Sequence, residues 1–237
     1  MALCRVRIAL LLDFDGVIMK RNPLFPDVSK RCHKYIQKYI PIRNIENVEE
    51  LNTQLYQATG HTVLGLQQLG FPASVSEFNQ YIYDSLDFKK LSIIEMENKE
   101  ENMQFTSLLC FCNENNIDPY IFSNAPPKWV STTLSYMLPK SDLLSRVRIL
   151  KNPHNKLKPT TSLYDSIEDN VLFDYDQIVF VDDKVINLLP VICRPKWNVM
   201  LLTNAIQDEP YLSICDGIGM VHDLNDVQMA LHNTLYN

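Results

Sequence analysis

Residues 7–17 read RIALLLDFDGV, and this stretch decides the fold class that the sequence predicts. The apolar run from Arg7 to Leu12 is typical of a buried strand in a parallel sheet, and it ends at Asp13. Two carboxylates, Asp13 and Asp15, directly after a strand can divide phosphoryl transfer between a nucleophile and a proton donor. Gly16 permits a backbone conformation that a side chain resists. Acidic turns after strands are common, so the rest of the chain must supply the context.

Three more apolar runs extend the strand pattern along the chain. They are Pro119 to Phe122, ending at Ser123; Gln177 to Val181, ending at Asp182; and Trp197 to Thr203. Helices are expected between them, over about 127–138, about 160–169 and shortly after residue 184. Strands alternating with helices predict an α/β fold with a parallel sheet and right-handed crossovers. Because ligands bind at the carboxyl ends of such strands, we expect Asp13, Ser123 and Asp182 to meet.

The segment from about Lys20 to Leu91 has a helical pattern instead. Two apolar stripes with spacings of three and four are Ile45, Val48, Leu51 and Leu55, and Val75, Phe78, Ile82 and Leu86. Such stripes predict amphipathic helices. We therefore expect a catalytic core over 1–19 and 96–237, with a helical cap over 20–95 inserted between the first and second motifs.

Two further motifs can bind an anion. The Ser123 hydroxyl and adjacent backbone N–H groups, including that of Asn124, stand at a turn before a helix and can hold phosphate. The alternative is that Ser123 only caps that helix. Lys158, fixed by the Pro159 that follows it, can neutralise phosphate and orient the nucleophile. Its alternative is a solvated surface lysine.

Asp182 and Asp183 form the second acidic pair. Paired carboxylates at the end of a buried strand are costly without a cation, so metal binding compensates them. Oxygen ligands suit Mg²⁺, which takes few carboxylates and keeps several waters. The alternative is a helix N-cap followed by an acidic first turn.

The order of these motifs resembles that of the haloacid dehalogenase-like (HAD) superfamily. A receiver domain has similar groups, but its hydroxyl and lysine follow both acid positions, so that interpretation fails. The resemblance implies a HAD-type Rossmannoid core with an inserted helical (C1-type) cap. It also implies the following roles: Asp13 as nucleophile and magnesium ligand; Asp15 as acid/base, with its backbone carbonyl on the metal; Ser123 and the Asn124 backbone on phosphate; Lys158 stabilising charge; and Asp182 and Asp183 at the metal. Members that cleave carbon–halogen bonds lack the second acid of the first motif, so Asp15 favours phosphoester chemistry.

The cap sequence is similar to that of yeast-type pyrimidine 5′-nucleotidases, which hydrolyse pyrimidine nucleoside monophosphates such as UMP and CMP. The similar positions are Leu51-Asn52, Tyr56, Gly60, Gly65-Leu66, Glu77-Phe78-Asn79 and Asp84-Ser85-Leu86. Tyr56, Tyr81 and Tyr83 could stack on a base, although packing is the commoner role of tyrosine on amphipathic helices.

Composition limits the other classes of function. The net charge of −6 disfavours a nucleic-acid or anionic-membrane binder, and no apolar stretch approaches the length of a membrane span. The apolar start is interrupted by Asp13 and Asp15, so we do not expect a signal peptide. Cys110 and Cys112 alone make a poor zinc pattern and are predicted to be small buried hydrophobes. Reduced thiols and no export signal favour a cytoplasmic protein.

The sequence therefore predicts a Mg²⁺-dependent phosphomonoesterase that acts through phospho-Asp13 on a small phosphorylated metabolite. A pyrimidine nucleoside 5′-monophosphate is the leading substrate. One alternative is a capped sugar-phosphate phosphatase or phosphoglucomutase-like enzyme. Another is a catalytically silent binding protein on the same scaffold. The oligomeric state is not predicted.

Overall fold

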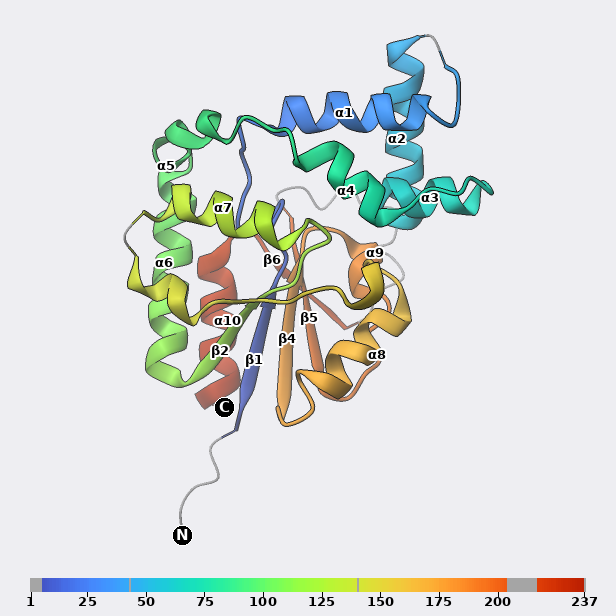
Figure 1. Cartoon of the computed structure of the whole chain (residues 1–237). Coiled ribbons are helices and arrows are strands. Elements are labelled where there is room, and N and C mark those ends of the chain that lie inside the picture. The colour runs from blue at the N-terminus through green and yellow to red at the C-terminus, as the bar shows by residue number, and fades with distance from the viewer. Residues whose placement is uncertain (1–5, 43, 140, 204–216, 237) are drawn as a thin grey trace.

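The computed structural model describes residues 6–42, 44–139, 141–203 and 217–236 (Figure 1). The first five residues of the apolar start, with Cys4, and also Cys215 lie outside the described residues. Within the described part of the chain, no helix is both long and apolar enough to cross a membrane.

The strands within these ranges form one six-stranded parallel sheet in the order β3-β2-β1-β4-β5-β6. Their bounds are β1 Ile8–Leu12, β2 Ile117–Ile121, β3 Arg148–Ile149, β4 Gln177–Asp182, β5 Trp197–Leu202 and β6 Ile218–Val221. β1 lies between β2 and β4 and is buried on both faces, which explains its continuous apolar run. The predicted α/β fold class is confirmed.

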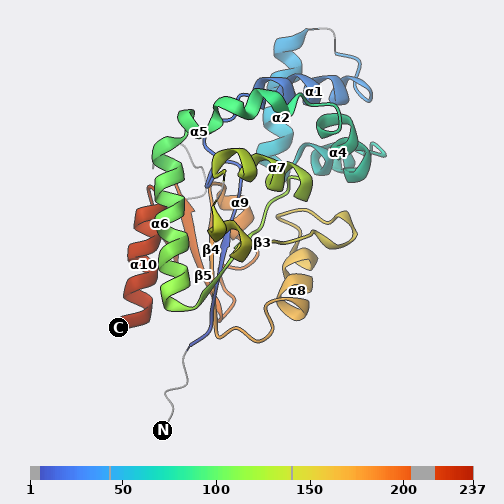
Figure 2. The same cartoon turned by 60° about the vertical axis from the view of Figure 1, so that its left-hand side comes forward.

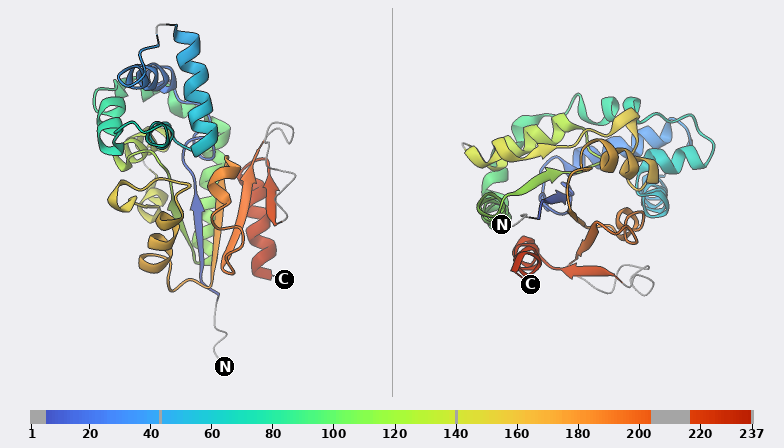
Figure 3. Two further views of the ribbon diagram at one scale, coloured as in Figure 1. Left: turned by 90° about the vertical axis from the view of Figure 1, so that its right-hand side faces the viewer. Right: turned by 90° about the horizontal axis from the view of Figure 1, so that it is seen from below.

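Helices cover both faces of this sheet (Figures 2 and 3). Their bounds are α6 Lys99–Asn115, α7 Pro127–Met137, α8 Thr161–Asn170, α9 Val185–Leu188 and α10 Leu224–Tyr236. Side chains alternate along a strand: Leu10 and Leu12 join the apolar cluster that includes α6, α7 and α10. Ala9 and Leu11 join the cluster that includes α8 and α9.

Four helices lie beyond the carboxyl ends of the central strands (Figure 1). They are α1 Phe25–Gln37, α2 Ile45–Thr59, α3 Thr62–Gln68 and α4 Val75–Tyr83. These helices have an apolar cluster of their own, which Leu157 from the rest of the chain joins. They occupy the segment predicted as a cap; the domain boundaries at 19/20 and 95/96 remain a prediction.

Short elements connect the helical region and the sheet: η1 Phe88–Ile93, α5 Ile94–Glu97, η2 Asp142–Arg146 and η3 Pro153–Asn155. One prediction on α6 is wrong, because Cys112 is buried but Cys110 is exposed. Residues two apart on an α-helix point about 200° apart, so both cannot face the same core.

Candidate active site

Three neighbouring strands bring the predicted site residues together. The Asp13 N–H donates to the Val181 carbonyl at 2.9 Å, and the Phe122 N–H donates to the Leu12 carbonyl at 2.8 Å. The sheet therefore continues to the residues at which β1, β2 and β4 end. The loop that carries Lys158 reaches the same place, as its contacts with Asp13 demonstrate.

Lys158 lies at the centre of the site and is 1 % exposed. Its Nζ is 2.9 Å from Oδ1 of Asp13 and 2.6 Å from Oδ2 of Asp182. Burial alone would lower the pKa of Lys158, but these two carboxylates outweigh it and raise that pKa above its ordinary value. The lysine is therefore charged, and the surface alternative is wrong.

Carboxylates surround this ammonium group in excess. Asp13, Asp182 and Asp183 each offer an oxygen, and these three atoms lie within 4.8 Å of one another. Burial, and then the charge of Asp182, raises the pKa of Asp183 to about 6. Burial also raises the pKa of Asp13 well above its ordinary range, with Lys158 opposing the shift and the other two carboxylates adding to it. Asp13 and Asp182 are buried and share Lys158, whereas Asp183 is half-buried and pairs with Lys184 at 3.2 Å. Three carboxylates against two ammonium groups still leave an excess of negative charge, which fits a divalent cation with oxygen ligands.

The Asp182 carboxylate is held by a side chain that the sequence interpretation missed. Asn187, on α9, donates through Nδ2 to Oδ1 of Asp182 at 2.9 Å and to Oδ2 at 3.1 Å. The Lys184 N–H also donates to Oδ1 of Asp182 at 2.9 Å, and Lys184 rather than Asp182 or Asp183 is the N-cap of α9. The available signal was an asparagine five residues after Asp182, in the first turn of a helix.

Asp15 stands apart from the group of three carboxylates. Its Oδ1 accepts a hydrogen bond from Nε1 of Trp129 at 3.4 Å. Burial raises the pKa of Asp15 to about 7, the Trp129 bond opposes this shift, and the Asp183 charge adds to it. Near neutral pH the carboxyl can therefore both give and accept a proton. Trp129 was missed, because an aromatic residue in a helix carries no signal of its direction.

Gly16 is required both by its backbone and by the neighbouring carboxylate. Its φ is +102°, in the region that side chains disfavour. A Cβ at this position would lie 2.4 Å from Oδ2 of Asp183. Glycine therefore lets the first acidic turn approach the second acidic pair.

The Ser123–Asn124 turn differs in part from its prediction. The Ser123 hydroxyl accepts from the Ala125 N–H at 3.1 Å, whereas the N-cap of α7 is Pro126, so the helix-cap alternative is wrong. The Asn124 side chain binds the backbone of Lys158. Nδ2 of Asn124 donates to the Lys158 carbonyl at 3.0 Å, and the Lys158 N–H donates to Oδ1 of Asn124 at 2.8 Å. Only the backbone of Asn124 was expected to act, so this positioning of the lysine is an additional finding.

The turn after α2 brings the helical region against the site. A Cβ on Gly60, whose φ is +76°, would lie 2.8 Å from Cδ of Pro159 and 3.3 Å from Oδ1 of Asn187. Tyr56, one turn earlier, is 39 % exposed. Burial of its hydroxyl, and then the charges of Asp183 and Asp13, raises the Tyr56 pKa well above its ordinary range. The Tyr56 ring thus combines proximity to the acids with exposed surface.

The tyrosines of α4 behave differently from Tyr56. Tyr83 packs against Trp129 with ring centroids 5.2 Å apart, as the packing interpretation expected. Tyr81 is 38 % exposed and contacts Tyr35 at a centroid distance of 5.7 Å.

The sequence matches no family model and no curated protein. The structure, however, resembles solved structures of HAD-superfamily hydrolases. A HAD phosphatase from Thermococcus onnurineus has a TM-score of 0.54 and 14% identity, covering 94% of this chain and 97% of that one. YfnB from Bacillus subtilis, named as a HAD-hydrolase and bound to magnesium, has a TM-score of 0.52 and 15% identity, covering 96% and 99%. The L-2-haloacid dehalogenase RSc1362 has a TM-score of 0.52 and 14% identity, covering 96% and 99%. The chain thus has a HAD-type fold.

Proposed function

We propose that this chain is a magnesium-dependent phosphomonoesterase that acts through a phosphorylated Asp13. The observation that carries the proposal is Asp15, whose pKa is raised to about 7 beside the group formed by Asp13, Lys158 and Asp182. A similar fold also occurs in a protein named as an L-2-haloacid dehalogenase. A halide leaves as a stable anion, whereas an alkoxide needs a proton as the bond breaks. A carboxyl that holds a proton near neutral pH therefore favours phosphoester hydrolysis.

In the proposed reaction the phosphoryl group passes first to Asp13 and then to water. An oxygen of Asp13 attacks phosphorus, the bond to the leaving oxygen breaks, and Asp15 gives that oxygen its proton. The Asp15 carboxylate then takes a proton from water, which attacks the phosphoryl group and regenerates Asp13. Lys158 contacts Oδ1 of Asp13 at 2.9 Å, so Oδ2 is left as the attacking atom.

The remaining residues bind and orient. The Ser123 hydroxyl and the Asn124 N–H would hold phosphoryl oxygens, while the Asn124 side chain holds Lys158 in place. Magnesium held by Asp13, Asp182, Asp183 and the backbone carbonyl of Asp15 would neutralise the negative charge of the phosphoryl oxygens.

For the substrate we propose a nucleoside 5′-monophosphate, with a pyrimidine base preferred. Two observations support this: the cap sequence is similar to that of pyrimidine 5′-nucleotidases, and Tyr56 combines an exposed surface with proximity to the acids. Sugar phosphates fit the same catalytic groups, so the assay must distinguish them.

The test is phosphate release from a panel containing UMP, CMP, purine monophosphates and sugar phosphates, with and without Mg²⁺. We expect magnesium-dependent release that is fastest with UMP or CMP. Asp13→Asn should remain folded and lose nearly all turnover, because an amide is a poor nucleophile. Full activity of that variant would refute the mechanism. Preference for sugar phosphates would keep the chemistry and overturn the nucleotide assignment, and no release from any substrate would favour the binding-protein alternative.

A further inference from the structure

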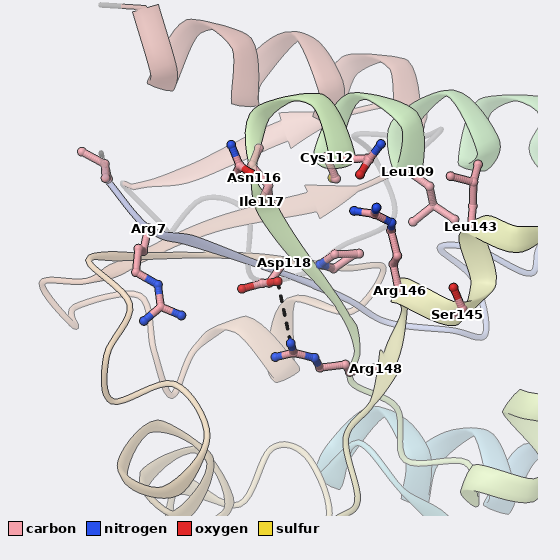
Figure 4. Close-up of a pocket in the computed structure, with 13 residues that line it drawn as sticks. Arg7, Leu109, Cys112, Asn116, Ile117, Asp118, Leu143, Ser145, Arg146 and Arg148 are labelled. Atoms are coloured by element: carbon pink, nitrogen blue, oxygen red, sulfur yellow. Dashed lines mark ion pairs between the residues drawn. The ribbon is translucent and has the colours of Figure 1, made fainter. Parts of the chain in front are cut away.

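A cavity lies at the end of the sheet opposite the acidic residues, and Figure 4 shows the side chains that line it. It has a volume of about 500 Å³, within the range of small-molecule sites. Arg7 precedes β1 and contributes to its wall, whereas Asp13 follows β1. At a rise of about 3.3 Å per residue these two positions are roughly 20 Å apart. A ligand here would therefore not contact the catalytic groups.

The charge of the cavity is opposite to that of the molecule. Three arginines, Arg7, Arg146 and Arg148, line it together with a single acid, Asp118, although the whole chain carries a net charge of −6. Arg7 is already paired with Asp174. Arg146 and Arg148 therefore supply most of the positive charge available to a ligand.

These two arginines are suited to an oxyanion in different ways. Arg148 is positioned in advance, because its Nη1 donates to the Tyr120 hydroxyl at 2.7 Å and its guanidinium lies over the Tyr120 ring. Its contact with Asp118 is long, at 4.0 Å (Figure 4). Arg146 is exposed and makes no ion pair among the described residues. A guanidinium fork without an acidic partner matches carboxylate or phosphate.

Asp118 can offset at most one of these two positive charges, and both of its oxygens already have partners. One of its carboxylate oxygens accepts from the Tyr175 hydroxyl at 2.5 Å, and the other makes the long contact with Arg148. Five apolar side chains, Leu109, Cys112, Ile117, Pro119 and Leu143, also line the cavity, interspersed with the polar Asn113, Asn116 and Ser145. A complementary ligand would therefore join an anionic group to an apolar body.

We propose that this cavity binds a small organic oxyanion, with its carboxylate or phosphate group on Arg146 and Arg148 and its apolar part against α6. The site is separate from the proposed phosphatase centre, and its test does not depend on that function.

The test is isothermal titration calorimetry of the full chain with phenylphosphonate and with benzoate, in EDTA. Both probes combine an oxyanion with a ring, neither is a phosphate ester, and the cation-free acidic site repels anions. The variants are Arg146→Gln and, as a matched control with the same change in charge, Arg21→Gln. Arg21 is exposed and lies outside the residues that line the cavity.

We expect saturable binding of at least one probe that becomes about tenfold weaker or more in Arg146→Gln, because a charged hydrogen-bond donor is lost. Arg21→Gln should bind as the wild type does. Binding of phenylphosphonate alone would identify a phosphorylated ligand, and tighter binding of benzoate a carboxylate. No saturable binding, binding unchanged in Arg146→Gln, or an equal loss in Arg21→Gln would overturn the proposal.

Discussion

Replacing Asp15 with asparagine should stabilise the cation-free protein at pH 8 while it removes the catalytic proton. Burial raises the pKa of Asp15 to about 7, because the ionised carboxylate loses its hydration in the folded state. The ionised form of Asp15 therefore destabilises the folded protein. Asparagine keeps the shape and the Oδ1 acceptor for Trp129, whose Nε1 donates at 3.4 Å in the wild type. The substitution therefore removes a charge and leaves the packing intact.

The size of the effect follows from the linkage between protonation and folding. Asp15 titrates near 3.8 when it is unperturbed and at about 7 in the folded chain. Between these values the folded state binds more protons than the unfolded state, so the free energy of unfolding falls as pH rises. The favourable contribution is present in full below about pH 4 and is lost above about pH 7. A shift of about three units corresponds to roughly 4 kcal/mol, of which about 2–3 kcal/mol falls between pH 5 and pH 8.

The assay is urea unfolding followed by circular dichroism, in EDTA, at pH 5 and at pH 8. Asp15→Asn is compared with the wild type and with Asp169→Asn, a neutralised acid that is exposed on α8. The stability gained by Asp15→Asn should grow by about 2–3 kcal/mol between the two pH values, and Asp169→Asn should show no such growth. A variant that is less stable than the wild type at pH 8, or a difference independent of pH, would refute the reasoning.

The same variant tests the role of Asp15 in turnover. Loss of a general acid costs about 10² to 10⁴ in rate, so phosphate release from a nucleotide should fall by about that factor. The loss should be smaller with p-nitrophenyl phosphate, whose leaving group needs no proton. An equal loss with both substrates would contradict proton donation by Asp15.

Three other changes have defined outcomes. Gly16→Ala should weaken Mg²⁺ activation at least about tenfold, because the alanine Cβ would displace the Asp183 carboxylate. A titration of activity against Mg²⁺ measures this effect, and an unchanged Mg²⁺ affinity would contradict the prediction. Asn124→Ala should lower kcat about tenfold and change KM little, because Lys158 loses both of its backbone hydrogen bonds to this side chain. Steady-state kinetics measure this, with Asn170→Ala as the control. A change in KM alone would point to substrate binding instead. Mg²⁺ at about 100 times its Kd should add roughly 3 kcal/mol to the free energy of unfolding, whereas NaCl of equal ionic strength should not; equal effects would exclude a specific site.

The sheet and the residues at the ends of its central strands could be predicted, because burial of a central strand leaves a pattern in consecutive residues of the sequence. β1 and β4 are buried on both faces, so residues 8–12 and 178–181 are continuously apolar. The end of such a run marks the edge of the sheet, which places Asp13 and Asp182 together. The edge strands β3 and β6 have only two and four residues and are partly exposed, so their apolar residues form patterns too short to distinguish from loops.

The contacts that position the catalytic groups could not be predicted in the same way. Trp129, Asn187 and the Asn124 side chain act through partners 114, 5 and 34 residues away. Of these three, only Asn187 lies close enough in sequence to its partner to leave a local pattern. The Trp129 contact depends on how α7 packs against the loop after β1, and the Asn124 contact on how the loop after β2 packs against the segment between η3 and α8. Both are tertiary properties.

The same acids that make the site reactive also weaken the fold without a cation. Asp13, Asp15 and Asp183 all have pKa values raised by burial. Among the described residues, the buried ammonium of Lys158 contacts Asp13, and the more exposed Lys184 contacts Asp183. Asp182 also contacts the Lys158 ammonium and accepts a hydrogen bond from Asn187, so the Asp182 carboxylate is held in one position. Cation binding would lower the free energy of the ionised carboxylates, and thereby stabilise the folded state at the pH at which Asp13 must be ionised to attack. Stability and nucleophilicity should therefore rise together as the cation binds, and Asp15, which lies outside the three carboxylates, keeps its proton for the leaving group.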